Sequence, residues 1–359
     1  MSMLIYDFQK RMLDIAPEKV FEIWLGIYKR IDYANGMWAS GTLEYVFANA
    51  PKTEKPEPGE NGLVTIYRGM GVLSQQPETA ISWTTHPGNA LWFANHSARG
   101  THLAMAEIAA DDIVAFFPGF YHENEVIVRP NTVRNIRYED MFPANEETFI
   151  KLTVPAIPEF LKFGRQAQKF GYKEESIFEV HGLKHILRVL LLSLIYFYNK
   201  RIKLTAGDKG ILIYFSLLHD AGRTNEDRDD EHGAASVAMI KAKDFCIDGL
   251  QLNKKDRRIA NLIIRYHCRD EEEGVHAIYT YPGFSGKDKK RAELLYLICK
   301  DMDGLDRVRF NGLDYRMLRT KFARQLPIIA GCLLKENVLA IFGENKKLDN
   351  TINTIGQEG

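Results

Sequence analysis

The spacing of apolar residues changes abruptly along this chain. Between residue 63 and about residue 140, apolar residues come in short runs rich in β-branched and aromatic side chains, which is typical of strands. From His181 onward, apolar residues recur at helical spacing over longer segments. The pattern predicts an α+β first half and an all-helical second half. The predicted strands are 63–67, 80–84, 103–108, 113–117 and 126–128, and the predicted helices are 182–199, 209–219, 232–245, 255–267, 291–302 and 314–334.

Prolines and polar stretches divide the chain further. Phe21, Trp24 and Tyr28 recur at helical spacing within a first segment, residues 1–48, and a loop rich in proline, glycine and charge follows at 51–62. The prolines at 143, 155 and 158 indicate a boundary near 150–170. We therefore expect a first domain at 1–150, a linker at 151–175, a helical domain at 176–342 and a flexible tail at 343–359.

The composition argues against several classes of protein. Lys plus Arg and Asp plus Glu number 47 each, so no net charge favours non-specific binding to nucleic acid or to a membrane. The four cysteines lie in the second half without a CxxC spacing, which is typical of free thiols in a reducing compartment. Asp7 comes before a signal peptide could form, and the apolar run 189–198 is too short to span a bilayer. We expect the protein to act in the cytoplasm, either of the cell that makes it or of a host cell into which it is delivered.

A first group of charged residues accompanies the predicted strands. Glu123 and Glu125 are two apart at the expected start of a strand, which would place both carboxylates on one face. Two adjacent carboxylates suit a reaction that develops positive charge on a sugar, because one stabilises the cation while the other meets the nucleophile. Arg68 ends an apolar strand just before Gly69, where a phosphate can approach and the guanidinium could hold it bidentately.

These residues resemble the Arg–Ser–Glu class of mono-ADP-ribosyltransferases over roughly residues 60–140. The matching segments are Tyr67-Arg68-Gly69, Ser82-Trp83-Thr84, Ala90-Leu91-Trp92-Phe93-Ala94 and Glu123-Asn124-Glu125. The resemblance implies an α+β fold, a β-sandwich with helices, and NAD as a substrate. It also implies cleavage of the nicotinamide bond and transfer of ADP-ribose to a protein or small-molecule acceptor.

The same resemblance implies a role for each residue. Glu125 would be the catalytic glutamate that bonds the ribose hydroxyl, and Glu123 would position the acceptor, with arginine favoured by the E-x-E spacing. Arg68 would hold the NAD phosphates, and Ser82 would support the nicotinamide end. The aromatic loop 116–121 would help to recognise the target. The remaining residues expected beside NAD are Gly69, Thr84 and Phe93.

Histidine and aspartate residues recur through the helical half. His219 and Asp220 follow an apolar helix and precede Gly222, a natural C-cap, so that imidazole and carboxylate could bind one cation. His181 and His185 are four apart, on one face of a helix. So many ionisable residues among Leu, Ile and Phe would be costly to bury without a metal or partners.

This second group resembles the HD superfamily of metal-dependent phosphohydrolases over about residues 180–310. The resemblance implies a helical bundle that hydrolyses a phosphoester with one or two divalent ions. A set of histidines and carboxylates without a thiolate admits Mn, Fe, Zn, Co or Mg. Arg223 or Lys184 would neutralise the phosphate, and Asp301 is an alternative to Asp303. The implied ligands are His185, His219, Asp220, His232, His267 and Asp303.

The two groups together predict a bifunctional enzyme. Its transferase domain would act on NAD, and its hydrolase domain would act on a nucleotide or on the ADP-ribose product. Such a pairing suggests a toxin, a secreted effector or a defence protein, by association rather than by physics. Two alternatives stay open. The chain is mainly a nucleotide phosphohydrolase whose first domain only binds, or the helical domain is a non-catalytic module that regulates the transferase.

Overall fold

The computed structural model describes residues 2–31, 36–96, 100–119, 123–170, 172, 181–198, 203–224, 227, 229–310 and 313–335. The chain divides into two compact units, one comprising residues 1–144 with 311–314 and the other residues 145–310 with 315–359. The division falls at 144 and 145, a few residues before the predicted boundary. The predicted tail at 343–359 lies outside the described residues.

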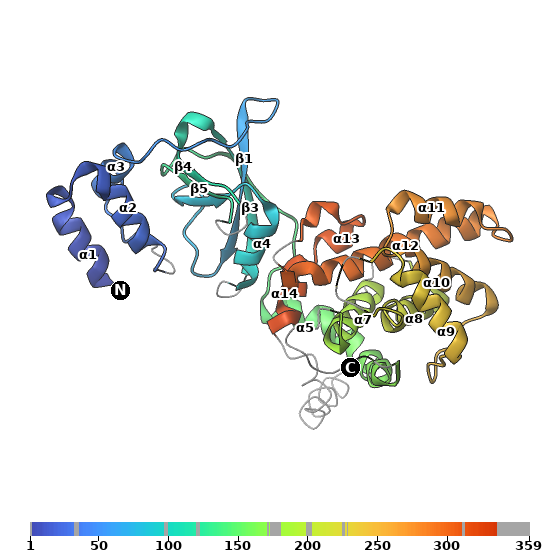
Figure 1. Ribbon diagram of the computed structural model, residues 1–359. Helices are drawn as coiled ribbons and strands as arrows, with labels where there is room; N and C mark the ends of the chain where they lie inside the picture. The colour runs from blue at the N-terminus through green and yellow to red at the C-terminus, as the bar shows by residue number, and fades with distance from the viewer. Residues whose placement is uncertain are drawn as a thin grey trace, which may run out of the picture. The chain divides into compact units, whose positions relative to one another are not determined.

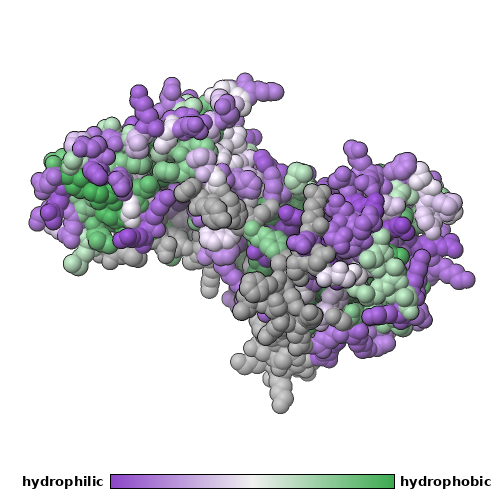
Figure 2. Space-filling view, in the orientation of Figure 1, coloured by the Kyte–Doolittle hydropathy of each residue, from purple (hydrophilic) through white to green (hydrophobic). Residues whose placement is uncertain are grey.

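Helices open the first unit, as the apolar spacing predicts. They are α1 (Ser2–Arg11), α2 (Pro17–Tyr28) and α3 (Ser40–Ala48). Trp24 of α2 is fully buried, and its ring lies 5.4 Å from that of Phe47 on α3. Other apolar side chains of this segment, among them Met3 of α1 and Leu13 between α1 and α2, are exposed, and Figure 2 shows apolar surface gathered over this part of the molecule.

The strands of the first unit form one antiparallel sheet (Figure 1). Their order across the sheet is β4-β5-β2-β1-β3-β6. A sandwich needs two facing sheets, so for the described residues that expectation is wrong, and an α+β unit with a single sheet replaces it. Buried residues of β5 alternate between two apolar clusters, and Ile127 packs with α2 and α3, so helices take the place of a second sheet. The strands are β1 (Leu63–Gly71), β2 (Ser82–Thr84), β3 (Gly100–Ala109), β4 (Ile113–Phe117), β5 (Glu125–Val128) and β6 (Arg134–Tyr138), of which β6 was not predicted.

Helix α4 (Pro87–His96) lies against β1 and β3. A Cβ atom at Gly69 would come within 1.9 Å of the carbonyl oxygen of Ala90. Gly69 therefore allows the helix backbone to approach the strand closely, and β1 continues past it without a turn. This packing accounts for the glycine, and its place beside a phosphate stays a prediction.

The second unit is helical throughout the residues that the structure describes (Figure 1). Its centre is formed by α7 and α8, whose side chains are almost all buried. No described helix in either unit has both the length and the apolar character needed to cross a membrane. The helices are α5 (Glu146–Thr153), α6 (Ile157–Gly164), α7 (Leu183–Tyr198), α8 (Ala206–Leu218), α9 (His232–Lys243), α10 (Lys254–Tyr266), α11 (Glu271–Thr280), α12 (Gly286–Leu305), α13 (Lys321–Arg324) and α14 (Pro327–Lys335).

The prediction of a linker at 151–175 is wrong for most of the residues that the structure describes there. Residues 146–170 are largely helical, and the buried side chain of Phe160 belongs to the second unit. Pro155 and Pro158 caused the error, because both lie in the first turn of a helical segment, where proline needs no backbone donor. The single helix predicted at 314–334 is also wrong, since α13 and α14 are separate and Pro327 begins the second.

Candidate functional site

Four predicted ligands of the second unit converge on one point. His185 comes from α7, His219 and Asp220 follow α8, and Asp303 lies near the end of α12. The Nε2 atoms of His185 and His219 are 3.2 Å apart, and Asp303 Oδ1 lies 3.4 and 3.8 Å from them. Asp220 Oδ2 lies 3.7 Å from each of the same nitrogens. Two atoms bound to one ion at about 2.1 Å are separated by about 3 to 3.4 Å at tetrahedral or octahedral angles, so this spacing suits a metal.

A second group of possible ligand atoms consists of Asp220 Oδ1, His232 Nε2 and His267 Nε2. The Oδ1 atom of Asp220 lies 3.2 Å from His232 Nε2 and 3.6 Å from His267 Nε2. The two imidazole nitrogens are 2.9 Å apart. His232 begins α9 and His267 caps α10, so elements far apart in the sequence meet at one carboxylate. The structure thus brings together all six predicted ligands, with Asp220 between two groups.

The hydrogen bonds of the imidazoles explain why these groups suit a cation. His185 Nδ1 lies 2.8 Å from Asp306 Oδ2, and His267 Nδ1 lies 2.7 Å from the carbonyl oxygen of Ile264. Since those oxygens only accept, each Nδ1 carries the hydrogen and each Nε2 presents a lone pair. Lone pairs and carboxylate oxygens therefore face one another, and a divalent ion or protons must lie among them.

The charge state of His219 agrees with this arrangement. Burial lowers the pKa of His219 to about 4, so its ring is neutral near pH 7, as a metal ligand must be. Burial also opposes protonation of His232, but contacts with Asp220 and Cys268 outweigh it and raise the pKa to about 10. Burial works against ionisation of Asp303, but its histidine neighbours outweigh this and lower its pKa. In the absence of an ion, a proton on His232 supplies the missing positive charge.

Asp306 orients the centre and was not predicted. Besides His185, it accepts hydrogen bonds from Arg188 Nη2 at 2.9 Å and from Arg309 Nη1 at 2.7 Å. Its side chain is 1% exposed, so it is a buried carboxylate held by two cations. The sequence could have indicated Asp306, because it lies three residues after Asp303 and shares its helical face.

The remaining residues of this group are also accounted for. Asp301 does not reach the centre, because its carboxylate accepts the backbone N–H groups of Arg319 and Thr320, which favours Asp303 as the ligand. His181 precedes α7 rather than lying on its face, but its Nδ1 still comes within 3.1 Å of Asp220 Oδ2. Of the two cations predicted to neutralise a phosphate, Lys184 is exposed and Arg223 Nη1 lies 3.0 Å from His232 Nδ1.

The prediction that Gly222 caps α8 is wrong. The helix ends in the ordinary right-handed conformation at His219. A Cβ atom at Gly222 would come within 2.3 Å of the backbone nitrogen of Ser236 on α9. The glycine therefore lets α9 approach the end of α8, which brings His232 to Asp220.

In the first unit, the predicted Arg, Ser and Glu lie on adjacent strands. Ser82 Oγ on β2 donates to Glu125 Oε1 on β5 at 2.9 Å. Arg68 Nη1 on β1 donates to the carbonyl oxygen of Ser82 at 2.6 Å. The side-chain Nε of Arg68 is buried without a hydrogen-bond partner among the described residues. Burial lowers the pKa of Arg68 and raises that of Glu125. Both charged groups are therefore poorly hydrated.

The paired carboxylates do not share a strand face. Glu123 and Asn124 have φ angles of 60° and 49°, and β5 begins only at Glu125. The alternation argument is therefore wrong, because Glu123 lies in a left-handed turn rather than in a strand. Thr84 Oγ1 donates to the backbone carbonyl of Glu123 at 2.7 Å, and Asn89 donates to the same oxygen. Thr84 thus supports the turn that carries Glu123.

Tyr28 joins this group and was not assigned to it from the sequence. Its hydroxyl interacts with Ser82 and with the charges of Glu125 and Arg68, and burial is the main reason why its pKa is raised. Lys29 follows at the end of α2, where its Nζ lies 4.9 Å from the centre of the Phe117 ring. Helical spacing predicts α2 but cannot indicate which strand its last turn meets.

Two further predictions for the first unit concern aromatic residues. Phe93 is half-buried on α4, and its ring lies edge-on to Trp92 at 5.1 Å between centres. Of the aromatic loop at 116–121, the residues at 120 and 121 lie outside the described residues. The place of Phe93 beside NAD stays a prediction.

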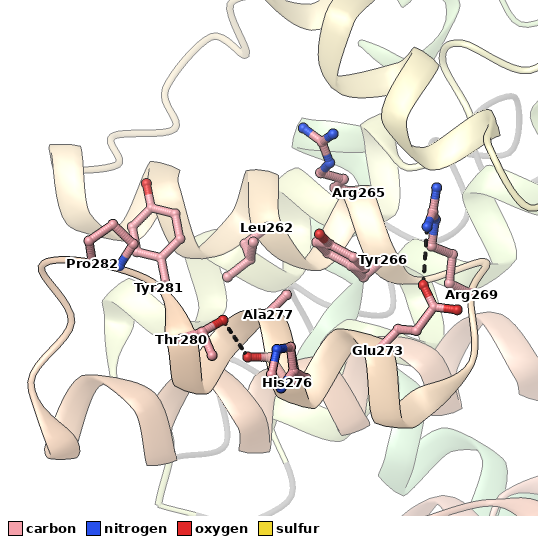
Figure 3. A pocket seen from close by; sticks show the side chains of 10 residues that line it. All are labelled: Leu262, Arg265, Tyr266, Arg269, Glu273, His276, Ala277, Thr280, Tyr281 and Pro282. Atoms are coloured by element: carbon pink, nitrogen blue, oxygen red, sulfur yellow. Dashed lines mark hydrogen bonds and ion pairs between the residues drawn. The ribbon is translucent and has the colours of Figure 1, made fainter.

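A surface groove of about 460 Å³ runs between α10 and α11 (Figure 3). Its lining includes Arg265, Tyr266, Arg269 and Tyr281, and Figure 3 shows Arg269 paired with Glu273. None of the predicted site residues lines it. The groove is thus separate from both groups.

Comparisons with models of known protein families, with curated proteins and with solved structures find no match for this chain.

Proposed function

We propose that the second unit is a metal-dependent phosphohydrolase of the HD type and that the first unit is an NAD-dependent mono-ADP-ribosyltransferase. The observation that carries the hydrolase proposal is the convergence of imidazole lone pairs and carboxylates around Asp220. These residues follow one another along the chain in the order that the resemblance implies. Such a buried group of acceptors is costly without a cation.

The metal centre would use the residues in two positions. His185, His219, Asp220 and Asp303 would hold one ion, and His232 and His267 would hold a second with the other oxygen of Asp220. A divalent ion there would lower the pKa of a bound water and polarise a phosphoryl oxygen. The protein itself would keep the imidazole of His219 neutral through burial and fix the orientation of His185 and His267 through Nδ1.

The transferase half is supported by the Ser82–Glu125 hydrogen bond beside Arg68. In NAD cleavage, the Glu125 carboxylate would stabilise positive charge on the ribose, and Arg68 would bind the diphosphate. Ser82 would orient Glu125 across the two strands. Tyr28, which lies against both, would exclude water from this side of the reacting sugar.

One pair of assays on the full chain tests both halves. Release of nicotinamide from NAD tests the transferase, and transfer of label from NAD to proteins of a lysate identifies an acceptor. Hydrolysis of bis(p-nitrophenyl) phosphate after loading with Mn²⁺ tests the hydrolase. Hydrolysis without nicotinamide release would support a binding-only first unit. Metal binding with NAD cleavage but without hydrolysis would support a regulatory second unit.

A further inference from the structure

Cys268 lies beside the second group of metal ligands, although no spacing in the sequence pairs a cysteine with a histidine there. Ligand atoms of His232, His267 and Cys268 all lie within 4.8 Å of one another. Cys268 directly follows His267 at the end of α10, and its Sγ donates to the carbonyl oxygen of Asp230 at 3.2 Å. That carbonyl immediately precedes Glu231 and His232, so the thiol reaches from one ligand-bearing helix end to the other.

The other three cysteines differ in their surroundings. Cys246 is exposed, Cys332 is half-buried, and Cys299 is buried in α12. Among the described residues, no histidine–carboxylate group suited to a metal contains any of these three. The two histidine side chains beside Cys268 are 7% and 2% exposed, so the thiol borders a buried pair of nitrogens rather than open solvent.

We propose that Cys268 is a ligand of the second metal position, which would then be built from His232, His267, Asp220 and a thiolate. On binding, the Sγ–H proton passes to solvent and a sulfur–metal bond forms, with no change in oxidation state. The inference rests on the metal half of the proposed function. It adds a sulfur ligand to the histidines and carboxylates predicted from the sequence.

A thiolate makes the two positions chemically different. His185, His219, Asp220 and Asp303 offer only nitrogen and oxygen, a set that Mn²⁺ or Fe²⁺ accepts readily. Replacing a carboxylate by sulfur favours Zn²⁺ or Co²⁺ over Mn²⁺ and Mg²⁺. The second position should therefore select a thiophilic ion, and the protein should hold two different metals when both are supplied.

Co²⁺ alone, added without oxygen to the metal-free full chain, is the probe that tests this. The wild type should show a sulfur-to-cobalt charge-transfer band in the near ultraviolet as well as the weaker visible bands of bound cobalt. Cys268→Ser should lose the near-ultraviolet band and keep visible bands from cobalt at the first position. Cys246→Ser, which changes an exposed thiol of the same unit, should keep both.

A second measurement does not depend on spectra. Cys268→Ser should weaken Zn²⁺ binding at one position by more than the roughly 10- to 100-fold caused by the loss of a group that only orients a ligand. Mn²⁺ binding at the other position should be unchanged. A near-ultraviolet band that survives in Cys268→Ser, or bound cobalt without that band in the wild type, would overturn the role of Cys268 and leave the metal centre intact. Failure of the wild type to bind Co²⁺, Zn²⁺ or Mn²⁺ at all would overturn the metal centre itself.

Discussion

His185 Nδ1 lies 2.8 Å from Asp306 Oδ2, and this contact decides which imidazole nitrogen faces the candidate metal centre. Because the carboxylate accepts the hydrogen on Nδ1, the Nε2 lone pair points toward Asp303. Arg188 and Arg309 hold the same carboxylate from its other sides. Orientation of the ligand and stability of the bundle therefore depend on one residue.

Replacing Asp306 should affect both properties. In Asp306→Asn, the two arginines keep their buried positions without a counter-charge, which should lower the free energy of unfolding by roughly 3–5 kcal/mol. Metal affinity should fall by roughly 10- to 100-fold, because His185 loses its charged partner. Urea unfolding and calorimetric titration with Mn²⁺ measure the two effects. Asp248→Asn is the control, since that side chain is 70% exposed, and the role of Asp306 is wrong if both variants bind Mn²⁺ equally.

Removal of two ligands should separate the two activities. His219→Ala combined with Asp220→Ala should strip bound transition metal and abolish phosphodiesterase activity, because Asp220 serves both ligand groups. Nicotinamide release should survive, since Arg68, Ser82 and Glu125 lie in the other compact unit. Metal analysis and the two assays decide it, with the exposed His276→Ala as a control. Loss of NAD cleavage in the double variant would contradict the separation.

The double variant also tests whether the proposed hydrolase acts on the product of the proposed transferase. If it does, the wild type should leave a phosphoribosyl or unmodified acceptor, and the variant should leave intact ADP-ribose. Mass spectrometry of the acceptor distinguishes the two. An identical ADP-ribose adduct from both proteins would contradict the coupling of the two proposed activities.

Glu125→Gln should slow NAD cleavage by roughly a hundredfold or more, because the amide keeps the shape but removes the charge that stabilises the ribose cation. Nicotinamide release from the folded variant measures the change. Glu57→Gln removes one carboxylate from an exposed loop of the same unit and should be silent. Near-normal cleavage by Glu125→Gln would rule out its catalytic role.

Glu123→Gln should separate transfer from hydrolysis. The carbonyl of Glu123 is held by Thr84 in a left-handed turn before β5, whereas the carboxylate of Glu125 is held by Ser82, so acceptor contacts should be lost before NAD contacts. Transfer to the acceptor should disappear while slow hydrolysis of NAD continues. Equal loss of the two activities would place Glu123 in direct contact with NAD.

His219 should make the stability of the metal-free protein depend on pH. Burial lowers its pKa from the ordinary 6.5 to about 4 in the folded state. Between these values the unfolded chain binds more protons, so the free energy of unfolding falls as the pH is lowered through the window, by about 3 kcal/mol in full. Urea unfolding of chelator-treated wild type and His219→Gln at pH 6.5 and 4.5 measures the difference. The variant should lose less stability on acidification, and equal losses would contradict this account.

Local periodicity was enough to predict most elements. Strand spacing around Arg68 and helical spacing around His219 depend only on neighbours in the chain, and the structure has β1 and α8 at those places. Pro155 and Pro158 misled the prediction because a proline that begins a helix and a proline in a linker look alike without the surrounding contacts.

The sequence alone determined which residues are able to act as ligands, since residue types and their order along the chain are local properties. Tertiary structure decided which of them meet. The contact of Asp306 with His185 spans 121 residues, and Cys268 reaches Asp230 across 38. Tyr28 meets Ser82 only because α2 packs on the sheet. Such contacts arise from burial of apolar faces on separate elements, and that packing has no signature at any one position.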